Sequence, residues 1–374
     1  MIPFNKLYFT GKEYQYIGES LKSGKISGDG IFTKKCHNYF EKKYFDKVLL
    51  TTSCTDALEM AALLLNISDG DEVIAPSFTF VSTVNPFVLR GAKIIFADSE
   101  TKTPNIDADK VEGLITDKTK AIIVVHYAGI ACDMDKIVRI AKKYDLYVVE
   151  DAAQAIDSFY KGTPLGSIGT FGTFSFHETK NIISGEGGLL VINDKKFMSR
   201  AEIVREKGTN RSSFFRGEAD KYGWVDVGSS FLPSDINAAI LYAQLERLQD
   251  IQNKRKKIWN QYYNLLLPLA EKGFFGLQYI PSFATNNAHM FFIECKNITI
   301  RDALISFLHE RNVQAVFHYQ ALHKSPYYKD KYMGKSLPNA DKYSDRLLRL
   351  PMYNELTERE VSLIVEKLKS FFVE

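Results

Sequence analysis

Short, almost entirely apolar runs alternate with amphipathic segments over the first 240 residues of this chain. Runs such as residues 121–126, 147–150 and 189–192 lack a polar face, which is typical of strands that are buried on both faces. The segments between such runs, for example residues 134–143, carry apolar side chains at helical spacing. Strands of this kind separated by helices indicate an α/β fold with a mainly parallel sheet between two helical layers.

The same pattern divides the chain into two parts. It predicts strands at residues 48–52, 72–75, 93–97, 121–126, 147–150, 171–176 and 189–192, and helices at 56–65, 134–143 and 198–207. After about residue 235 it predicts one long helix at 235–267, a strand at 291–295, a helix at 301–310 and a strand at 314–317. We therefore expect a large α/β domain over residues 1–240. Residues 241–374 then hold the long helix and a small α+β domain.

Composition and charge argue against several classes of function. The 48 basic and 45 acidic residues give a net charge of +3, so nucleic acid is not an expected partner. No apolar run approaches the ~20 residues that a membrane helix needs, and the N-terminus does not resemble a signal peptide, so we expect a cytoplasmic protein. The 4 cysteines form no C-x-x-C pair and the 7 histidines form no H-E-x-x-H motif, so no metal site is expected.

A lysine between two predicted strands is the strongest candidate for chemistry. Lys180 follows the strand at 171–176 and precedes the glycine-rich segment 184–188. A water-poor setting lowers the pKa of a lysine towards that of a usable amine, and nearby glycines let a planar cofactor lie against the backbone. Ser175 is close enough in sequence to bind a phosphate of that cofactor. The alternative is a solvated surface lysine in a loop.

A carboxylate at the end of another predicted strand is the second candidate. The strand at 147–150 ends in Glu150 and is followed by Asp151. Glu150 is expected to be structural, whereas Asp151 lies where α/β sheets bind ligands. In pyridoxal 5'-phosphate (PLP) enzymes, a carboxylate there keeps the pyridine nitrogen protonated, so that the ring withdraws electrons. The alternative is an aspartate that caps the next helix.

Two further segments could complete such a site. Ser53 and Thr55 lie at a strand-to-helix junction, where backbone N–H groups and hydroxyls form an anion site, although either residue could simply cap the helix. Asp56 is compatible with a phosphate there only if its carboxylate points away. Phe80 could belong to the core or lie flat on a cofactor ring. The P-loop, the dinucleotide-binding glycine motif and the G-x-S-x-G elbow are all missing from the sequence.

Taken in order, several of these segments resemble a known family. The motifs are C-T-D-A-L at 54–58, P-S-F-T-F at 76–80, E-D-A-A-Q at 150–154, F-S-F-H-E-T-K-N at 174–181 and G-E-G-G at 185–188. They are similar in order and spacing to the nucleotide-sugar aminotransferases of the DegT/DnrJ/EryC1/StrS family, and the similarity extends over residues 1–374. The resemblance implies PLP as cofactor and an aspartate-aminotransferase-like fold (fold type I) with a small α+β C-terminal domain.

The resemblance also implies roles for individual residues. Lys180 is expected to carry PLP as a Schiff base and to move the proton during catalysis. The other expected cofactor-binding residues are Asp151 at the pyridine nitrogen, Gln154 near the ring hydroxyl, Phe80 on the ring face, and Thr55, Asp56 and Ser175 at the phosphate. Ser230 is expected to reach the phosphate of the neighbouring subunit, where many relatives have asparagine. The family forms homodimers with composite active sites.

The substrate side is expected to involve basic residues and a loop near the C-terminus. The candidates are Arg211, Arg216, Lys207, His318 and His323. For the two arginines and Lys207, a solvated surface role is an equally valid interpretation. Two departures from the family pattern affect these expectations: Asp56 replaces a small residue, and Ala321 replaces a proline between the two histidines.

Within the family, the chain most resembles the subgroup that aminates C4 of dTDP-4-dehydro-6-deoxy-D-glucose in the synthesis of enterobacterial common antigen. Residues 1–5, 27–30, 126–129, 205–211, 214–217, 228–230 and 288–291 carry that resemblance. It implies L-glutamate as amino donor and dTDP-4-amino-4,6-dideoxy-D-galactose as product. The alternatives are a 3-aminotransferase of dTDP-3-oxo-sugars, a PLP-binding protein without turnover and an α/β binding protein without PLP. A sugar 3-dehydratase would have histidine in place of Lys180.

Overall fold

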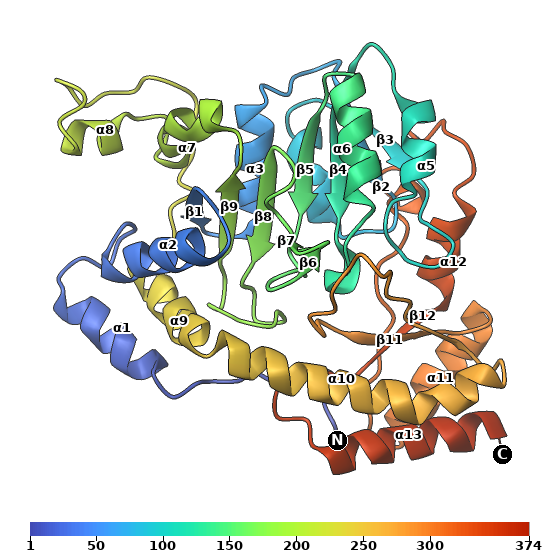
Figure 1. The fold of residues 1–374 in the computed structure, drawn as a ribbon. Helices are drawn as coiled ribbons and strands as arrows, with labels where there is room; N and C mark the ends of the chain where they lie inside the picture. Colours follow the sequence, from blue (N-terminus) through green and yellow to red (C-terminus); the bar gives the residue numbers. More distant parts are fainter. Residues whose placement is uncertain (374) are drawn as a thin grey trace.

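The core of the large domain is a seven-stranded sheet between two layers of helices (Figure 1). The computed structural model describes residues 1–373. In sheet order the strands are β1 (Val48–Thr51), β9 (Gly188–Ile192), β8 (Phe171–Ser175), β5 (Tyr147–Asp151), β4 (Thr119–Val125), β2 (Glu72–Pro76) and β3 (Lys93–Ala97). Only β9 runs antiparallel to its neighbours, which confirms the predicted mainly parallel sheet.

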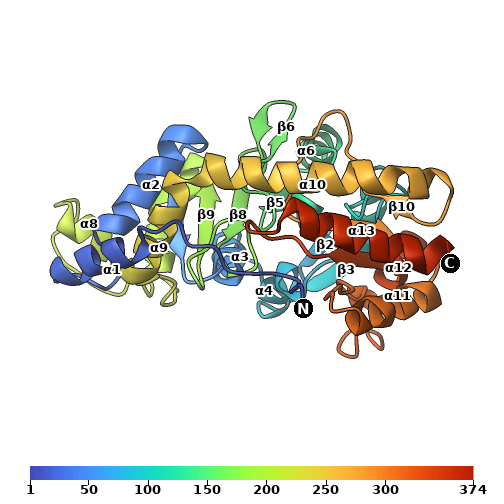
Figure 2. The ribbon, with the colours of Figure 1, turned by 90° about the horizontal axis from the view of Figure 1, so that it is seen from below.

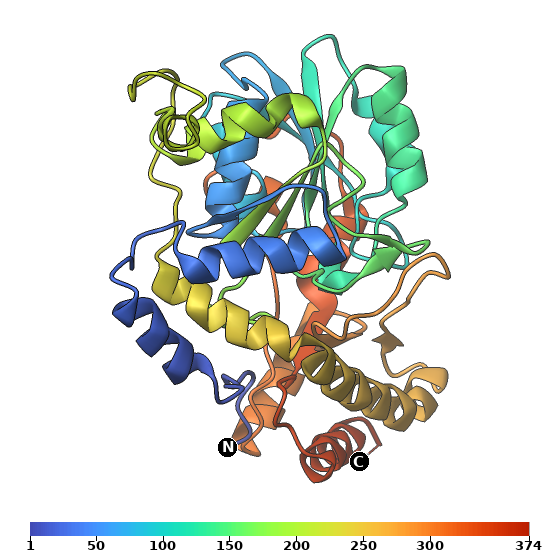
Figure 3. The same ribbon diagram turned by 60° about the vertical axis from the view of Figure 1, so that its left-hand side comes forward.

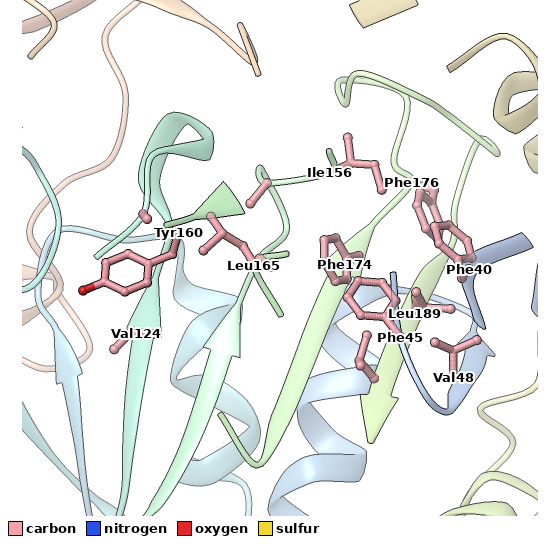
Figure 4. Packing of buried hydrophobic residues seen from close by; sticks show 14 of the residues in the cluster. Phe40, Phe45, Val48, Val124, Ile156, Tyr160, Leu165, Phe174, Phe176 and Leu189 are labelled. Atoms are coloured by element: carbon pink, nitrogen blue, oxygen red, sulfur yellow. The ribbon is translucent and has the colours of Figure 1, made fainter. Parts of the chain in front are cut away.

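Successive side chains along the strands enter two different hydrophobic cores. In β1, Val48 and Leu50 pack in one core while Leu49 packs in the other. The first core is closed by α2 (Ile31–Lys43), α6 (Met134–Lys143) and α9 (Asp235–Glu246), and the second by α3 (Cys54–Leu64) and α7 (Met198–Arg205). In Figure 4, the ring of Phe40 in α2 lies beside that of Phe176, just after β8, and the ring of Phe45 lies beside that of Phe174 in β8. Both faces of the sheet are therefore dry, as the unbroken apolar runs predict.

The small domain has its own sheet and its own core. Its antiparallel strands are β10 (Gly276–Leu277), β11 (Phe291–Glu294) and β12 (Leu347–Leu350), and its helices are α10 (Leu248–Glu271), α11 (Ile298–Glu310), α12 (Pro338–Arg346) and α13 (Glu358–Val373). Figure 2 shows α10 and α13 side by side along this domain. Ile2 also belongs to this core, because its backbone pairs with Val313. The remaining elements are α1 (Glu13–Lys22), α4 (Asn85–Val88), α5 (Ala108–Val111), β6 (Phe159–Tyr160), β7 (Thr163–Pro164) and α8 (Arg211–Phe215).

The predicted strands of the large domain agree with the structure to within two residues, but two predictions for the second half of the chain are wrong. The single long helix is broken at Arg247 into α9 and α10, so that α9 covers the large sheet while α10 extends into the small domain. The predicted strand at 314–317 is only an isolated bridge between Val316 and Arg349.

Within residues 1–373, no helix has both the length and the apolar character that a membrane span requires.

A buried carboxylate joins the N-terminus of α2 to α9. Asp235 accepts hydrogen bonds from the backbone N–H groups of Phe32 (3.2 Å) and Thr33 (2.8 Å) and from the hydroxyls of Thr33 (2.9 Å) and Ser20 (3.3 Å). The N-cap residue of α2 is Gly30, which has no side chain to cap the helix. A Cβ atom at Gly30 would lie 2.3 Å from the Asp235 carboxyl carbon, so the glycine makes room for this cap.

We expect Asp235→Ala to lower the free energy of unfolding by about 2–4 kcal/mol, because it leaves buried N–H donors unpaired. Asp235→Asn keeps one acceptor oxygen and should lose about half as much. Urea unfolding followed by circular dichroism measures both values. An Asp235→Ala protein within about 0.5 kcal/mol of the wild type would show that this cap does not stabilise the fold.

Candidate active site

A cavity of about 660 Å³ lies at the carboxyl ends of β4, β5 and β8, beside the N-terminus of α3. The ends of these strands contribute Val125, Asp151 and Ser175 to its wall, and the start of α3 together with the two residues before it contributes residues 52–55. Lys180, from the connection between β8 and β9, also lines it. This is the position at which open α/β sheets bind ligands. The cavity therefore brings together residues that lie more than a hundred positions apart in the sequence.

Asp151 is buried at the end of β5 and has only neutral hydrogen-bond donors. Its side chain accepts a hydrogen bond from the Thr83 hydroxyl at 2.7 Å and one from the backbone N–H of Ala153 at 3.1 Å. Burial raises the pKa of this carboxyl group, although both hydrogen bonds and the charge of Lys180 act in the opposite direction. A buried carboxylate in a cavity is stabilised when a cationic group binds next to it. Asp151 is thus suited to hold a protonated ring nitrogen.

The neighbouring Glu150 is structural, as predicted. Its carboxylate accepts hydrogen bonds from three backbone N–H groups within residues 166–169, at 2.6 to 2.8 Å, and contacts His126 Nε2 at 2.9 Å. Both side chains are fully buried. Successive side chains of a strand point to opposite faces, so Glu150 organises the loop before β8 while Asp151 faces the cavity.

Lys180 lies in the connection between β8 and β9. Its backbone N–H donates to the carbonyl of His177 at 2.9 Å, and the connection is closed by the hydrogen bond from Phe176 N–H to the Gly187 carbonyl at 2.8 Å. A Cβ atom at Gly188 would lie 2.3 Å from the backbone of Ser53, so only glycine lets β9 start this close to α3. Lys180 is half-buried, and burial lowers the pKa of its amine, as expected for a lysine that reacts with a carbonyl group.

The N-terminus of α3 presents hydroxyl groups to the cavity. Ser53 caps the helix, with its hydroxyl accepting the Asp56 N–H at 3.0 Å, and the Thr55 hydroxyl donates to Ser82 at 3.0 Å. The Asp56 carboxylate accepts a hydrogen bond from the Thr52 hydroxyl, and Asp56 is not part of the cavity wall. The cap and the anion site are therefore compatible, but the Asp56 N–H is already paired within the helix cap.

Aromatic and amide groups form another part of the wall. Phe80 is 53% exposed, an unusual state for such a side chain, and its ring centroid lies 5.9 Å from that of Tyr319. The Gln154 amide donates to the Tyr319 hydroxyl at 3.0 Å and accepts from the Ala128 N–H at 2.6 Å. Phe80, Gln154 and Tyr319 all line the cavity. The ring of Phe80 is thus available to a flat ligand.

Within one chain, Ser230 and the predicted arginines do not reach this cavity. Ser230 is exposed and forms an isolated bridge with Glu206. Arg211 and Arg216 line a separate cavity and form ion pairs with Glu206 and Glu202, respectively. Figure 3 shows the segment around α8 at the outer edge of the large domain. Their expected roles stay predictions, and so does that of Lys207, whose backbone pairs with Ser229.

The two predicted substrate histidines are held by other side chains. His318 Nδ1 lies 2.5 Å from the hydroxyl of Tyr127, and burial lowers the pKa of the His318 ring. His323 is buried, with Nδ1 2.7 Å from the Ser77 hydroxyl and Nε2 3.4 Å from Asp341. Neither histidine is part of the cavity wall, although Tyr319, next to His318, is. A substrate role for either histidine remains a prediction.

Sequence reasoning did not assign several residues of the cavity wall, among them Thr83 and Tyr319. Thr83 donates to Asp151, and Tyr319 lies beside Phe80 and Gln154. A signal for Thr83 was present, since it lies one short turn after Phe80 and its hydroxyl can point to the same side. Tyr319 lies in a segment without regular secondary structure, and its sequence neighbours do not indicate where its ring points.

The chemistry of the wall fits PLP. It offers a lysine amine for an aldehyde, a buried carboxylate for a cationic ring nitrogen, hydroxyls at a helix N-terminus for a phosphate and an exposed aromatic ring for stacking. Among residues 1–373, no cluster of three or more His, Cys, Asp or Glu side chains is arranged to hold a metal ion. The four cysteines are buried free thiols.

Comparisons with known proteins agree with this site. The sequence profile of the DegT/DnrJ/EryC1/StrS aminotransferase family matches residues 9–369. The GDP-perosamine synthase of Escherichia coli O157:H7 is 33% identical over 378 residues, which cover 99% of this chain and 98% of that protein. Two solved structures are also similar over 99% of each chain. A sugar aminotransferase of Streptococcus pneumoniae, Spr1654, has a TM-score of 0.91 at 27% identity in its PMP form, and an aminotransferase of Psychrobacter cryohalolentis has a TM-score of 0.92 at 26% identity.

These similarities extend over nearly the whole chain, and Spr1654 is known in both PLP and PMP forms. They confirm fold type I, PLP as cofactor and the aminotransferase class. The chain therefore belongs to the DegT/DnrJ/EryC1/StrS aminotransferase family and is a PLP-dependent nucleotide-sugar aminotransferase.

Proposed function

We propose that this enzyme transfers the amino group of L-glutamate to C4 of dTDP-4-dehydro-6-deoxy-D-glucose, giving dTDP-4-amino-4,6-dideoxy-D-galactose and 2-oxoglutarate. The observation that carries the proposal is the single cavity in which Lys180 and the buried Asp151 meet beside the α3 N-terminus. The choice of this sugar rests on the resemblance of segments such as 205–211 and 288–291 to the C4-aminating subgroup.

The residues of the cavity have distinct roles in this proposal. Bound PLP supplies an electron-withdrawing pyridinium ring. Asp151 keeps the ring nitrogen protonated, and the hydroxyls of Thr55 and Ser175 bind the phosphate. Phe80 orients the ring by stacking. The amine of Lys180 moves a proton between the cofactor and C4 of the sugar, which its lowered pKa favours.

A second candidate substrate follows from the relatives. The GDP-perosamine synthase is 33% identical to this chain over almost its full length, so a GDP-linked sugar is an alternative to the dTDP-linked one. Amination at C3 of a dTDP-3-oxo-sugar is the other alternative. The diphosphate needs cations, and Arg211 and Arg216 are our candidates if a partner subunit brings them near the cavity.

Incubation with L-glutamate and one ketosugar at a time distinguishes these substrates. The three substrates are dTDP-4-dehydro-6-deoxy-D-glucose, a dTDP-3-oxo-6-deoxy sugar and GDP-4-dehydro-6-deoxy-D-mannose. We expect the first to be converted with a kcat/KM at least about tenfold above the others, and NMR to place the new amine at C4 in the galacto configuration. Lys180→Ala protein is the control for uncatalysed reaction. Preference for the GDP sugar, or an amine at C3, would overturn the assignment.

Asp151→Asn tests the proposed role of the buried carboxylate. The change keeps the shape but removes the charge that protonates the ring, so we expect kcat to fall by about 100-fold or more while PLP still binds through its phosphate. Asp157→Asn is a matched control, because Asp157 bonds the Tyr44 hydroxyl and asparagine tolerates its φ of 56°. Near-normal turnover of Asp151→Asn protein would mean that Asp151 has only a local structural role.

We also propose a homodimer whose active sites contain residues of both subunits, with Ser230 contacting the cofactor phosphate of the partner. The exposure of Ser230 and its position outside the cavity of its own chain support this arrangement. Mixing Lys180→Ala chains with chains disabled at residues 228–230 should restore part of the activity, because half of the sites in a mixed dimer are intact. Energy transfer between two differently labelled sets of chains verifies subunit exchange. Exchange without any recovery of activity would mean that each site is built from one chain.

A further inference from the structure

A turn at residues 286–289, where the chain enters β11, contacts two segments beside the cavity, one at residues 154–156 and one at Asn181. The Asn287 side chain donates to the backbone carbonyls of Gln154 (2.8 Å) and Ile156 (2.9 Å) and accepts the His289 N–H at 3.0 Å. Ala288 is fully buried and has a φ of 52°, a left-handed conformation that side chains other than glycine rarely adopt. Residues in such strained backbone conformations persist where many surrounding contacts hold them in place, often next to active sites.

A buried arginine holds this turn in place. Arg255 of α10 donates from Nε to the carbonyl of Ala288 at 3.0 Å and from Nη2 to that of His289 at 2.6 Å. No carboxylate within residues 1–373 forms an ion pair with it, and burial lowers its pKa to about 10. A buried guanidinium without a counter-ion is unfavourable on its own, so the two carbonyls of the turn are its compensating partners.

The turn reaches the catalytic lysine through Asn181, the next residue in the chain. Asn181 Nδ2 donates to Gln252 Oε1 at 2.8 Å and to the Asn287 carbonyl at 2.9 Å, and its Oδ1 lies 2.8 Å from His289 Nδ1. A backbone carbonyl can only accept, so this pattern assigns Nδ2 as the donor and makes His289 Nδ1 the donor to Oδ1. Burial lowers the pKa of His289 well below its ordinary value, which keeps the ring neutral.

We propose that Asn181 and His289 are positioning residues that set the direction of the Lys180 side chain in the cavity. Through the turn at 286–289, the same network holds the backbone of Gln154, another residue of the cavity wall, so Lys180 and Gln154 are fixed relative to each other. This inference rests on the proposed role of Lys180. It accounts for the presence, at this point of the fold, of a strained alanine next to a buried arginine whose hydrogen-bond partners are backbone carbonyls.

His289→Asn and His289→Gln separate positioning from packing. The asparagine amide nitrogen occupies nearly the place of His Nδ1 and keeps the donor to Asn181, whereas the glutamine amide nitrogen occupies the place of Nε2 and loses it. In the apo-protein, we expect PLP to attach to Lys180 at least about tenfold more slowly in His289→Gln protein. We expect kcat to fall by a similar factor while KM for the sugar changes less than about twofold. His289→Asn protein should remain within about threefold of the wild type in both rates.

If His289 had a purely structural role, its variants would change Tm but not the rate of PLP attachment. Tyr262→Phe is the matched control, because it removes another buried hydrogen bond of the small domain, from Tyr262 to the Pro351 carbonyl at 3.1 Å. It should lower Tm without changing the rate of PLP attachment. Equal attachment rates for His289→Asn and His289→Gln proteins would overturn the inference. If His289→Gln protein does not fold, Asn181→Ala carries the same prediction, and an unchanged attachment rate in that variant would overturn it.

Mass spectrometry after borohydride reduction separates this inference from the proposed function. Cofactor found on a lysine other than Lys180 in the wild-type protein would contradict the proposed function. Cofactor on Lys180, together with equal attachment rates in the two His289 variants, would contradict only the positioning role. Cofactor on Lys180, together with slow PLP attachment in His289→Gln protein and fast attachment in His289→Asn protein, supports the proposed function and the positioning role.

Discussion

Burial of the large sheet on both faces decides where polar chemistry can lie in this protein. Side chains along the strands enter one dry core or the other, so an ionisable group inside the sheet is stable only where other protein groups pair with it. Glu150 shows how fully such a group must be satisfied, since three N–H donors and His126 surround it. Reactive groups therefore gather at the strand ends and just beyond them. Asp151, Ser175 and Lys180 all lie there, within one cavity.

The same constraint made much of the fold predictable. A short apolar run without a polar face is most easily buried as a strand between two helical layers. The strands of the large sheet accordingly lie close to the predicted positions. The break between α9 and α10 at Arg247 carries no glycine or proline signal, and Leu248 and Ile251 of α10 still pack in the same core as α9, so no local pattern predicts the break. The pairing of Ile2 with Val313 joins the chain's first residues to its last domain, a long-range contact that no local pattern predicts.

The site was predictable to a similar extent. Lys180, Asp151, Ser175 and Thr55 could be identified because each follows a recognisable strand or starts a helix. Tyr319 and the turn at 286–289 could not, because their positions depend on how the small domain packs against the large one. The network around Asn181 shows that the small domain contributes to the geometry of the site through hydrogen bonds with residues next to the cavity wall, as well as through Tyr319 in the wall itself.

The proposed function depends on one covalent attachment, that of PLP to Lys180. Its most direct test is borohydride reduction of the purified wild-type protein, followed by protease digestion and mass spectrometry of the peptides. We expect the reduced cofactor on the peptide that contains Lys180 and on no other. Recovery of the cofactor on a different lysine, or of an unmodified Lys180 peptide from protein that contains PLP, would contradict it.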